Sequence, residues 1–285
     1  MTTRLLARTA LIALIGACTA TPAVTTSSSA PTTTAPSATT TPTLARCSDE
    51  FEFNEGGEIA ELPQESSDSR TIGAISWETV GDCETFTVAF QTAEGAPATT
   101  SPSARVLHLE SFQVLRVRLL SVAATIISDQ LVETNLVDRI YVVRSLDDGM
   151  FLDLHLAAPA QARVETANSP GRLMITLKPG LVPLEGFSTV GERVVVTSPA
   201  TGLTVDPFLT VTGYSRTFEG NVLLIATAGN DVVVERSTTA ADWAETWGEF
   251  RATISLPQGP VSLFVGESRA EDGALEGLTV RMTVR

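Results

Sequence analysis

The central part of the chain alternates apolar and polar residues with a period of two, which is typical of β-strands with one buried face. Residues 151–156 read FLDLHL, so three leucines share one face while Asp153 and His155 share the other. We interpret this second face as wet or partnered, and His155 as a surface residue. Residues 172–178, RLMITLK, repeat the alternation, and an Asp-Gly pair at 148–149 between two apolar runs predicts a hairpin turn.

Further apolar runs extend this pattern toward the N-terminus. They predict additional strands at residues 85–92, 105–111 and 113–122. Residues 123–135 fit either a short helix or an irregular connection. Together these runs predict a β domain at residues 47–180.

The C-terminal part shows seven short apolar runs separated by turn-forming residues. The runs are 193–197, 209–214, 221–227, 232–237, 249–256, 261–267 and 278–284. Short, regularly spaced strands favour a β-sandwich over a parallel sheet, because a parallel sheet needs helical crossovers. We therefore expect a mainly β protein of two β domains, with a linker at residues 181–190 and a sandwich of about seven strands at residues 191–285.

The N-terminus has the layout of an export signal. Arg4 and Arg8 precede a short apolar stretch and then the small residues before Cys18. The stretch is shorter than the roughly 20 residues that a membrane-spanning helix needs. The sequence IGAC at 15–18 resembles the bacterial lipobox, in which a signal peptidase cuts before a cysteine that carries a lipid. This resemblance implies a lipoprotein signal peptide at residues 1–17 and lipidation of Cys18, with an ordinary secretory signal as the alternative.

A low-complexity segment follows the cysteine. Residues 19–43 consist of Thr, Ser, Ala and Pro, with Val24 as the exception. Such a composition cannot bury enough apolar surface to offset the loss of chain entropy on folding. We expect a disordered tether at residues 18–46. The chain would then be lipid-anchored at the extracytoplasmic face of the cell membrane, with the membrane as its partner through the Cys18 lipid.

The charge of the chain argues against one class of partner. Asp and Glu number 33 against 19 Lys and Arg, which gives a formal net charge of −14. Binding to nucleic acid depends on Lys and Arg that neutralise phosphates. We therefore expect no nucleic-acid partner.

Two cysteines remain once Cys18 is set aside. Cys47 and Cys83 are an even pair, and outside a reducing cytoplasm they can form one disulfide. Zinc binding is a poor alternative, because two distant cysteines without a nearby histidine lack the spacing of zinc ligands. We predict a Cys47–Cys83 disulfide, with two free thiols as the alternative.

Residues 72–180 resemble a known family. The stretches SWETVGDCETFTVAFQ at 76–91 and YVVRSLDDGMFLDLHLAAPAQARVETANSPGRLMITLKPG at 141–180 resemble the AMIN-like domains of actinobacterial envelope proteins. The resemblance implies an AMIN-like β domain at residues 47–180 and an association with the envelope or the cell wall. It carries no catalytic signature.

The C-terminal domain contains a series of residues in an order that is typical of one family. They are Ser198-Pro199, Gly202, Pro207, Gly213, Phe218-Glu219-Gly220, Phe250, Glu267-Ser268 and Asp272-Gly273. On these residues the domain resembles the Gmad2 family, the immunoglobulin-like domain named from bacterial spore germination proteins. It implies an immunoglobulin-like β-sandwich at residues 191–285. We interpret Phe218 as a plug of the sandwich core. Glu219 and Glu267 are candidate binding residues, which would hold a cation or a partner's arginine, or would cap turn amides.

No recognisable pattern of catalytic or metal chemistry occurs in the sequence. His108 and His155 lie far from any nucleophile motif, and the zinc, calcium and phosphate-loop spacings are missing. We predict no catalytic residues, no metal site and no cofactor. Trp243 and Trp247 lie four residues apart on a possible helical turn. Core or lid packing is their default interpretation, and a platform for stacking carbohydrate is the sharper alternative.

These observations favour a non-catalytic exported lipoprotein of the cell envelope. Its two β domains would bind cell-wall glycan or another envelope protein. The alternative is an accessory or degenerate enzyme of peptidoglycan metabolism.

Overall fold

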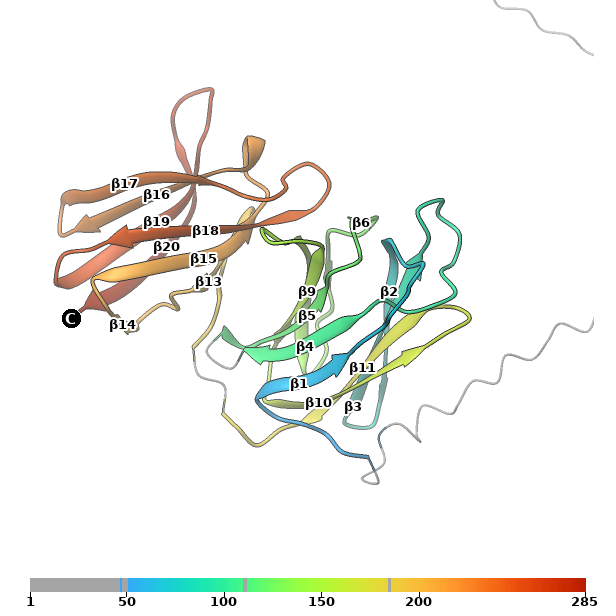
Figure 1. Cartoon of the computed structure of the whole chain (residues 1–285). Coiled ribbons are helices and arrows are strands. Elements are labelled where there is room, and N and C mark those ends of the chain that lie inside the picture. The colour runs from blue at the N-terminus through green and yellow to red at the C-terminus, as the bar shows by residue number, and fades with distance from the viewer. Residues whose placement is uncertain (1–46, 48–50, 110–111, 184–185) are drawn as a thin grey trace, which may run out of the picture. The chain divides into compact units, whose positions relative to one another are not determined.

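The chain folds into three β-sheets in a computed structural model that describes residue 47 and residues 51–109, 112–183 and 186–285 (Figure 1). The expected signal peptide, Cys18 and the tether lie outside these residues. Among the described residues, no helix combines the length and the apolar character needed to cross a membrane. The expectation of a mainly β protein is confirmed.

The first group of strands, which we call the first sandwich, packs two sheet layers against each other. Its strands are β1 (Gly57–Leu62), β2 (Thr71–Val80), β3 (Cys83–Gln91), β4 (Ala104–Leu109), β5 (Val114–Leu119), β6 (Ala124–Thr125), β7 (Asp129–Leu131), β8 (Val137–Arg144), β9 (Met150–Leu156), β10 (Ala160–Ala167) and β11 (Arg172–Pro179). One layer has the order β10-β11-β3-β2-β6, and the other contains β1-β4-β5-β9-β8. A single apolar core with residues from both layers lies between them.

The alternation in the sequence correctly predicts the inner face of the first sandwich. Leu152, Leu154 and Leu156 on β9 are all buried in this core. The hairpin at 148–149 is confirmed, because β8 and β9 pair in antiparallel fashion on either side of it. Residues 123–135 contain the short strands β6 and β7 and no helix, so the irregular connection is the better of the two interpretations.

The remaining strands form the second sandwich. They are β12 (Thr189–Val190), β13 (Val194–Ser198), β14 (Thr204–Val205), β15 (Phe208–Ser215), β16 (Asn221–Ala228), β17 (Asp231–Thr239), β18 (Trp247–Ser255), β19 (Gly259–Ser268) and β20 (Leu275–Val284). The layer β14-β20-β19-β16-β17 faces the strands β18-β15-β13-β12 across a second apolar core. All seven predicted strands are present, and two short strands are added: β12, where the sequence predicts linker, and β14. The domain boundaries themselves stay predictions.

One sheet runs through both sandwiches. Strand β8 pairs in parallel with β18, with Val143 opposite Trp247 and Arg144 opposite Gly248. The result is a ten-stranded sheet that ends at β1 on one side and at β12 on the other. Next to this junction lies a third apolar cluster, whose members are Tyr141, Val143, Phe151, Val195, Tyr214 and Trp247.

The junction overturns the interpretation of His155 as a surface residue. Its Nε2 forms a hydrogen bond with the hydroxyl of Tyr214, which lies on β15. Asp153, on the same face of β9, is fully buried and accepts two hydrogen bonds from Arg116 on β5, both of 2.7 Å. The polar face of β9 is partnered because strands far away in the sequence cover it, which the local pattern cannot reveal.

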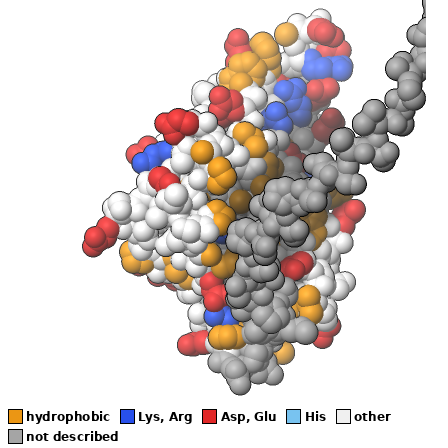
Figure 2. Space-filling model, turned by 90° about the vertical axis from the view of Figure 1, so that its right-hand side faces the viewer, with side chains coloured by type: hydrophobic (Ala, Val, Ile, Leu, Met, Phe, Trp, Pro, Cys, Tyr) orange, Lys and Arg blue, Asp and Glu red, His pale blue; other side chains and the backbone are white. Residues whose placement is uncertain are grey.

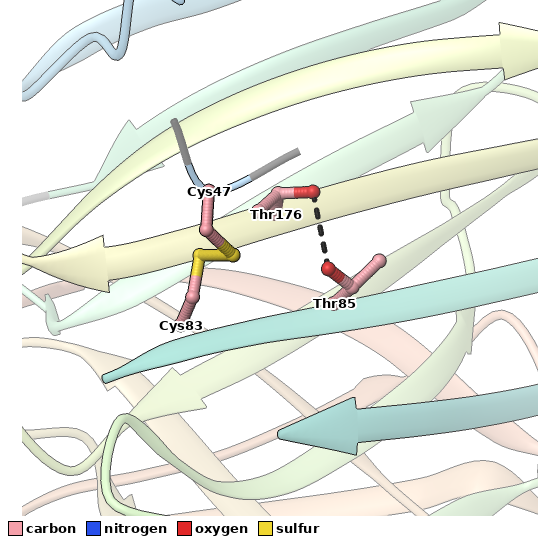
Figure 3. Close-up of a disulfide and its surroundings, with 4 residues drawn as sticks. All are labelled: Cys47, Cys83, Thr85 and Thr176. Atoms are coloured by element: carbon pink, nitrogen blue, oxygen red, sulfur yellow. Dashed lines mark hydrogen bonds between the residues drawn. A yellow bond between two sulfur atoms is a disulfide. The ribbon is translucent and has the colours of Figure 1, made fainter. Parts of the chain in front are cut away.

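A disulfide ties the N-terminal end of the described chain to β3 (Figure 3). Cys47 is bonded to Cys83, the first residue of β3, and the two Cα atoms are 6.0 Å apart. Two residues further along β3, the hydroxyl of Thr85 forms a 3.3 Å hydrogen bond with that of Thr176 on β11. The cross-link therefore lies at one end of the central strand of this layer, which pairs with β11 on one side and β2 on the other.

Candidate functional site

Two exposed aromatic side chains meet at one end of the second sandwich. Phe218 lies in a single 3₁₀ turn between β15 and β16, and Trp243 lies in the loop between β17 and β18. Phe218 is 59% exposed and Trp243 41% exposed. Their ring centroids are 5.6 Å apart with the planes inclined by 62°, a favourable edge-to-face arrangement. We call these two residues the aromatic pair.

This geometry corrects two predictions from the sequence. Phe218 is not a plug of the sandwich core, because its side chain lies on the surface. The helical turn expected for Trp243 and Trp247 is not formed, since residues 241–246 are an irregular loop and Trp247 begins β18. The two tryptophans consequently have different surroundings.

Asp242 holds the loop that carries Trp243. Its Oδ1 accepts hydrogen bonds from three successive backbone N–H groups, those of Trp243 (2.6 Å), Ala244 (3.0 Å) and Glu245 (3.2 Å). Its Oδ2 accepts a 2.9 Å hydrogen bond from Nε of Arg144. Burial raises the pKa of Asp242, but these bonds outweigh it and the net shift is downward. A charged carboxylate therefore fixes the loop in one conformation.

A glycine allows this loop to lie close to β18. A Cβ atom on Gly248 would lie 2.2 Å from the backbone nitrogen and the backbone oxygen of Asp242. Any larger residue would push the loop away from the strand.

Glu267 holds the other member of the aromatic pair. Its Oε2 accepts a 2.6 Å hydrogen bond from the backbone N–H of Phe218, and its Oε1 lies 2.8 Å from Nη1 of Arg193. Glu267 is buried, whereas Glu219 is exposed and has a left-handed φ of 54°. The two predicted glutamates therefore do not form one site. Glu267 satisfies a turn amide and an arginine of the same chain.

A shallow cavity of about 330 Å³ adjoins Phe218. Its charged lining residues are Arg193, Glu267, Arg269, Glu271 and Glu276. Arg269 pairs with Asp272 at 2.7 Å and with Glu276 at 3.5 Å. Polar groups of both signs thus lie beside an apolar aromatic surface.

Residues 193–274 match the family model of Gmad2, the immunoglobulin-like domain of bacterial spore germination. The Gmad2 region includes both members of the aromatic pair and Glu267. The Gmad2 domain family is not known as enzymatic. No curated protein and no solved structure matches the chain.

Trp247 lies in the Gmad2 region but takes no part in the exposed surface. It is buried, with its ring centroid 5.0 Å from that of Tyr141 and 5.9 Å from that of Tyr214. Its Nε1 donates a 3.3 Å hydrogen bond to Asp129 on β7. Trp247 therefore packs in a core, as the default interpretation expects, and of the two tryptophans only Trp243 is exposed.

The sequence gives no signal for the partnership of Trp243 with Phe218. The two residues belong to separate turns, and Asp242 and Arg193, which help to hold them, belong to no motif. Within the described residues, no group of three or more His, Cys, Asp or Glu residues is placed to hold a metal ion.

On the face drawn in Figure 2, apolar, acidic and basic side chains are interspersed.

Proposed function

We propose that the chain is a non-catalytic, exported lipoprotein of the cell envelope and that it binds cell-wall glycan through the aromatic pair. The single observation that carries the proposal is the exposure of two aromatic rings that the protein holds in fixed positions. Phe218 and Trp243 expose 59% and 41% of their surface, although each is anchored through its own backbone.

The chemistry of the surface suits a sugar chain. The apolar face of a pyranose ring packs against aromatic rings, and its hydroxyl groups exchange hydrogen bonds with carboxylates and guanidinium groups. The cavity beside Phe218 offers both of these charged groups. Because the backbone that carries each ring is already held by a hydrogen bond, little backbone entropy is lost on binding.

The N-terminal part of the chain supports the location. Cys18 would carry the lipid, and residues 18–46 would hold the folded part away from the membrane. The resemblance of residues 72–180 to AMIN-like envelope domains is consistent with a ligand in the cell wall, as an analogy between folds.

The test is retention of the full chain on insoluble peptidoglycan. We expect the double variant Phe218→Ala, Trp243→Ala to bind about tenfold more weakly, since the contacts of two rings are worth about 1.4 kcal/mol or more. Phe208→Ala is the matched control, because Phe208 is 79% exposed at the far end of β15, where it pairs with Ser255.

Three results would overturn the proposal. Equal retention of the double variant and the Phe208→Ala control would remove the aromatic pair from glycan binding. If the chain bound no glycan but crosslinked to an envelope protein through Trp243, the ligand would be a protein. Release of muropeptides by the purified chain would instead support the enzymatic alternative.

A further inference from the structure

Two arginines lie directly opposite each other in the first sandwich. Strands β4 and β5 are antiparallel neighbours, and Arg105 is paired with Arg118 in their register. Directly opposed residues in such a ladder point to the same face, and like charges in this position destabilise the sheet. A negative charge close to the two guanidinium groups would offset this repulsion.

Only one of the two arginines has such a charge. Arg105 donates two hydrogen bonds to Oε2 of Glu58, from Nε at 2.8 Å and from Nη2 at 2.5 Å. Arg118 is half-buried, and its Nε is buried without a hydrogen-bond partner. Throughout the described ranges, no ion pair or hydrogen bond involves the guanidinium group of Arg118. Unsatisfied donors at a half-buried charged group are costly.

The neighbouring arginine shows what Arg118 lacks. Arg116 lies two residues earlier on the same strand and on the same face, opposite Asp153 of β9. Its Nε and Nη2 both donate to that carboxylate, at 2.7 Å each. The residue of β9 opposite Arg118 is Phe151, which offers no acceptor. The sheet therefore supplies an oxyanion to Arg116 and none to Arg118.

An open cavity is present at this position. Its volume is about 330 Å³, and its lining includes both Arg105 and Arg118. Leu62, Pro63 and Leu120 supply apolar surface, and Leu120 is 66% exposed. The exposed Glu61 lies at the same cavity and is opposite Arg105 in the pairing of β1 with β4.

We propose that this cavity binds an oxyanion, the phosphate or carboxylate group of a small amphiphilic ligand, with Arg118 as the main contact. The planar guanidinium group of Arg118 would donate two parallel hydrogen bonds, as that of Arg116 does to Asp153. The apolar part of the ligand would lie against Leu62, Pro63 and Leu120. The site lies on β4 and β5 and is independent of the aromatic pair.

Calorimetric titration of the full chain tests this site, with inorganic phosphate and hexanoate as the two probes. Chloride keeps the ionic strength constant, so that general screening does not contribute. We expect one saturable site for at least one probe, and the probe that binds more tightly identifies the source of the oxyanion. Arg118→Gln should weaken that binding at least tenfold.

Two further variants separate the site from general charge effects. Arg172→Gln removes an exposed arginine from β11 of the same sandwich and should leave the affinity unchanged. Glu61→Gln removes the negative charge at the cavity and should strengthen binding. Arg118→Lys keeps the charge without the planar fork and gives intermediate binding, which serves as the readout if Arg118→Gln does not fold.

The proposal is overturned if neither probe binds saturably. It is also overturned if Arg172→Gln weakens binding as much as Arg118→Gln, or if Arg118→Lys binds as well as the unsubstituted chain. Circular dichroism in chloride alone verifies that each variant is folded.

Discussion

Arg144 on β8 and Asp242 in the loop before β18 form an ion pair, with Nε and Oδ2 2.9 Å apart. Asp242 uses its other oxygen to fix the loop that carries Trp243. The position of an exposed tryptophan in the second sandwich thus depends on an arginine of the first sandwich, outside the residues that match Gmad2.

Asp242→Ala should loosen this loop. The substitution removes the acceptor of three backbone N–H groups and leaves Arg144 without this partner, so we expect a loss of roughly 1–3 kcal/mol in the free energy of unfolding. Retention on peptidoglycan should fall as it does in Trp243→Ala. Urea unfolding measures the first effect, and Asp148→Ala, at an exposed hairpin position, is the control. An unchanged unfolding curve for Asp242→Ala would contradict the assigned role.

Glu267 and Glu219 should respond differently to substitution. Glu267→Ala leaves the N–H of Phe218 without its acceptor and removes the ion pair with Arg193, so we expect a loss of about 1–2 kcal/mol. Glu219→Ala removes an exposed side chain and should change the stability by less than about 0.5 kcal/mol. Thermal unfolding of the two variants side by side gives the comparison. Equal losses would show that the difference in burial has no energetic consequence.

His155 should make the stability depend on pH. Burial lowers its pKa to about 4, below the ordinary value of 6.5, and Asp153 only partly opposes this shift. The unfolded chain therefore binds an extra proton between these values. The stabilisation is complete above pH 6.5 and is lost as the pH falls toward 4, by about 2 kcal/mol between pH 7.5 and pH 5.

Urea titrations at pH 7.5 and pH 5 measure this dependence. His155→Gln should reduce the difference between the two pH values by that amount, because contributions from all other groups cancel in the comparison. The prediction fails if the variant and the unsubstituted chain lose the same stability on acidification.

Removal of the disulfide should destabilise the first sandwich. Cys47 and Cys83 are separated by 36 positions, and closing a loop of this length is worth roughly 4 kcal/mol in the chain-entropy account. Cys47→Ser, Cys83→Ser and the reduced chain should all show the same loss in denaturant unfolding. A loss found only for Cys83→Ser would point to packing around β3 rather than to the cross-link.

Cys18→Ser tests the anchor. If the cysteine carries a lipid, the variant should leave the membrane fraction and appear in the medium, whereas Ser27→Ala, in the proposed tether, should not. Fractionation and immunoblotting measure this distribution. Continued membrane association of Cys18→Ser would contradict the lipoprotein interpretation.

The parts of the fold that follow from local pattern were accessible from the sequence. The leucines of β9 and seven of the nine strands of the second sandwich are examples, because a period of two determines which residues face a core. Strand β10, AQARVETA, escaped prediction since its inward positions include small alanines that give a weak apolar signal.

The candidate site was only partly accessible. Trp243 and Glu267 could be selected by residue type, but so were Glu219 and Trp247, which do not belong to the site, and pairing Trp243 with Phe218 requires two loops to meet in space. The lack of a partner for Arg118 depends on the register of β4, β5 and β9. The register between strands that are distant in the sequence is set when the sheet assembles. The pattern of residues along the chain therefore does not predict it.

The way in which strands pair within and between the two sandwiches has a practical consequence for the design of fragments. A fragment limited to residues 193–274 would lose the whole of β20, which begins at Leu275. Strand β19 would then lack the antiparallel partner with which it pairs along its length. It would also uncover Tyr214 and Trp247, which are buried at the junction. Such a piece would expose open strand edges and apolar rings together, a combination that promotes aggregation. A fragment for study in solution should therefore include β20 and the strands of the first sandwich that cover Tyr214 and Trp247.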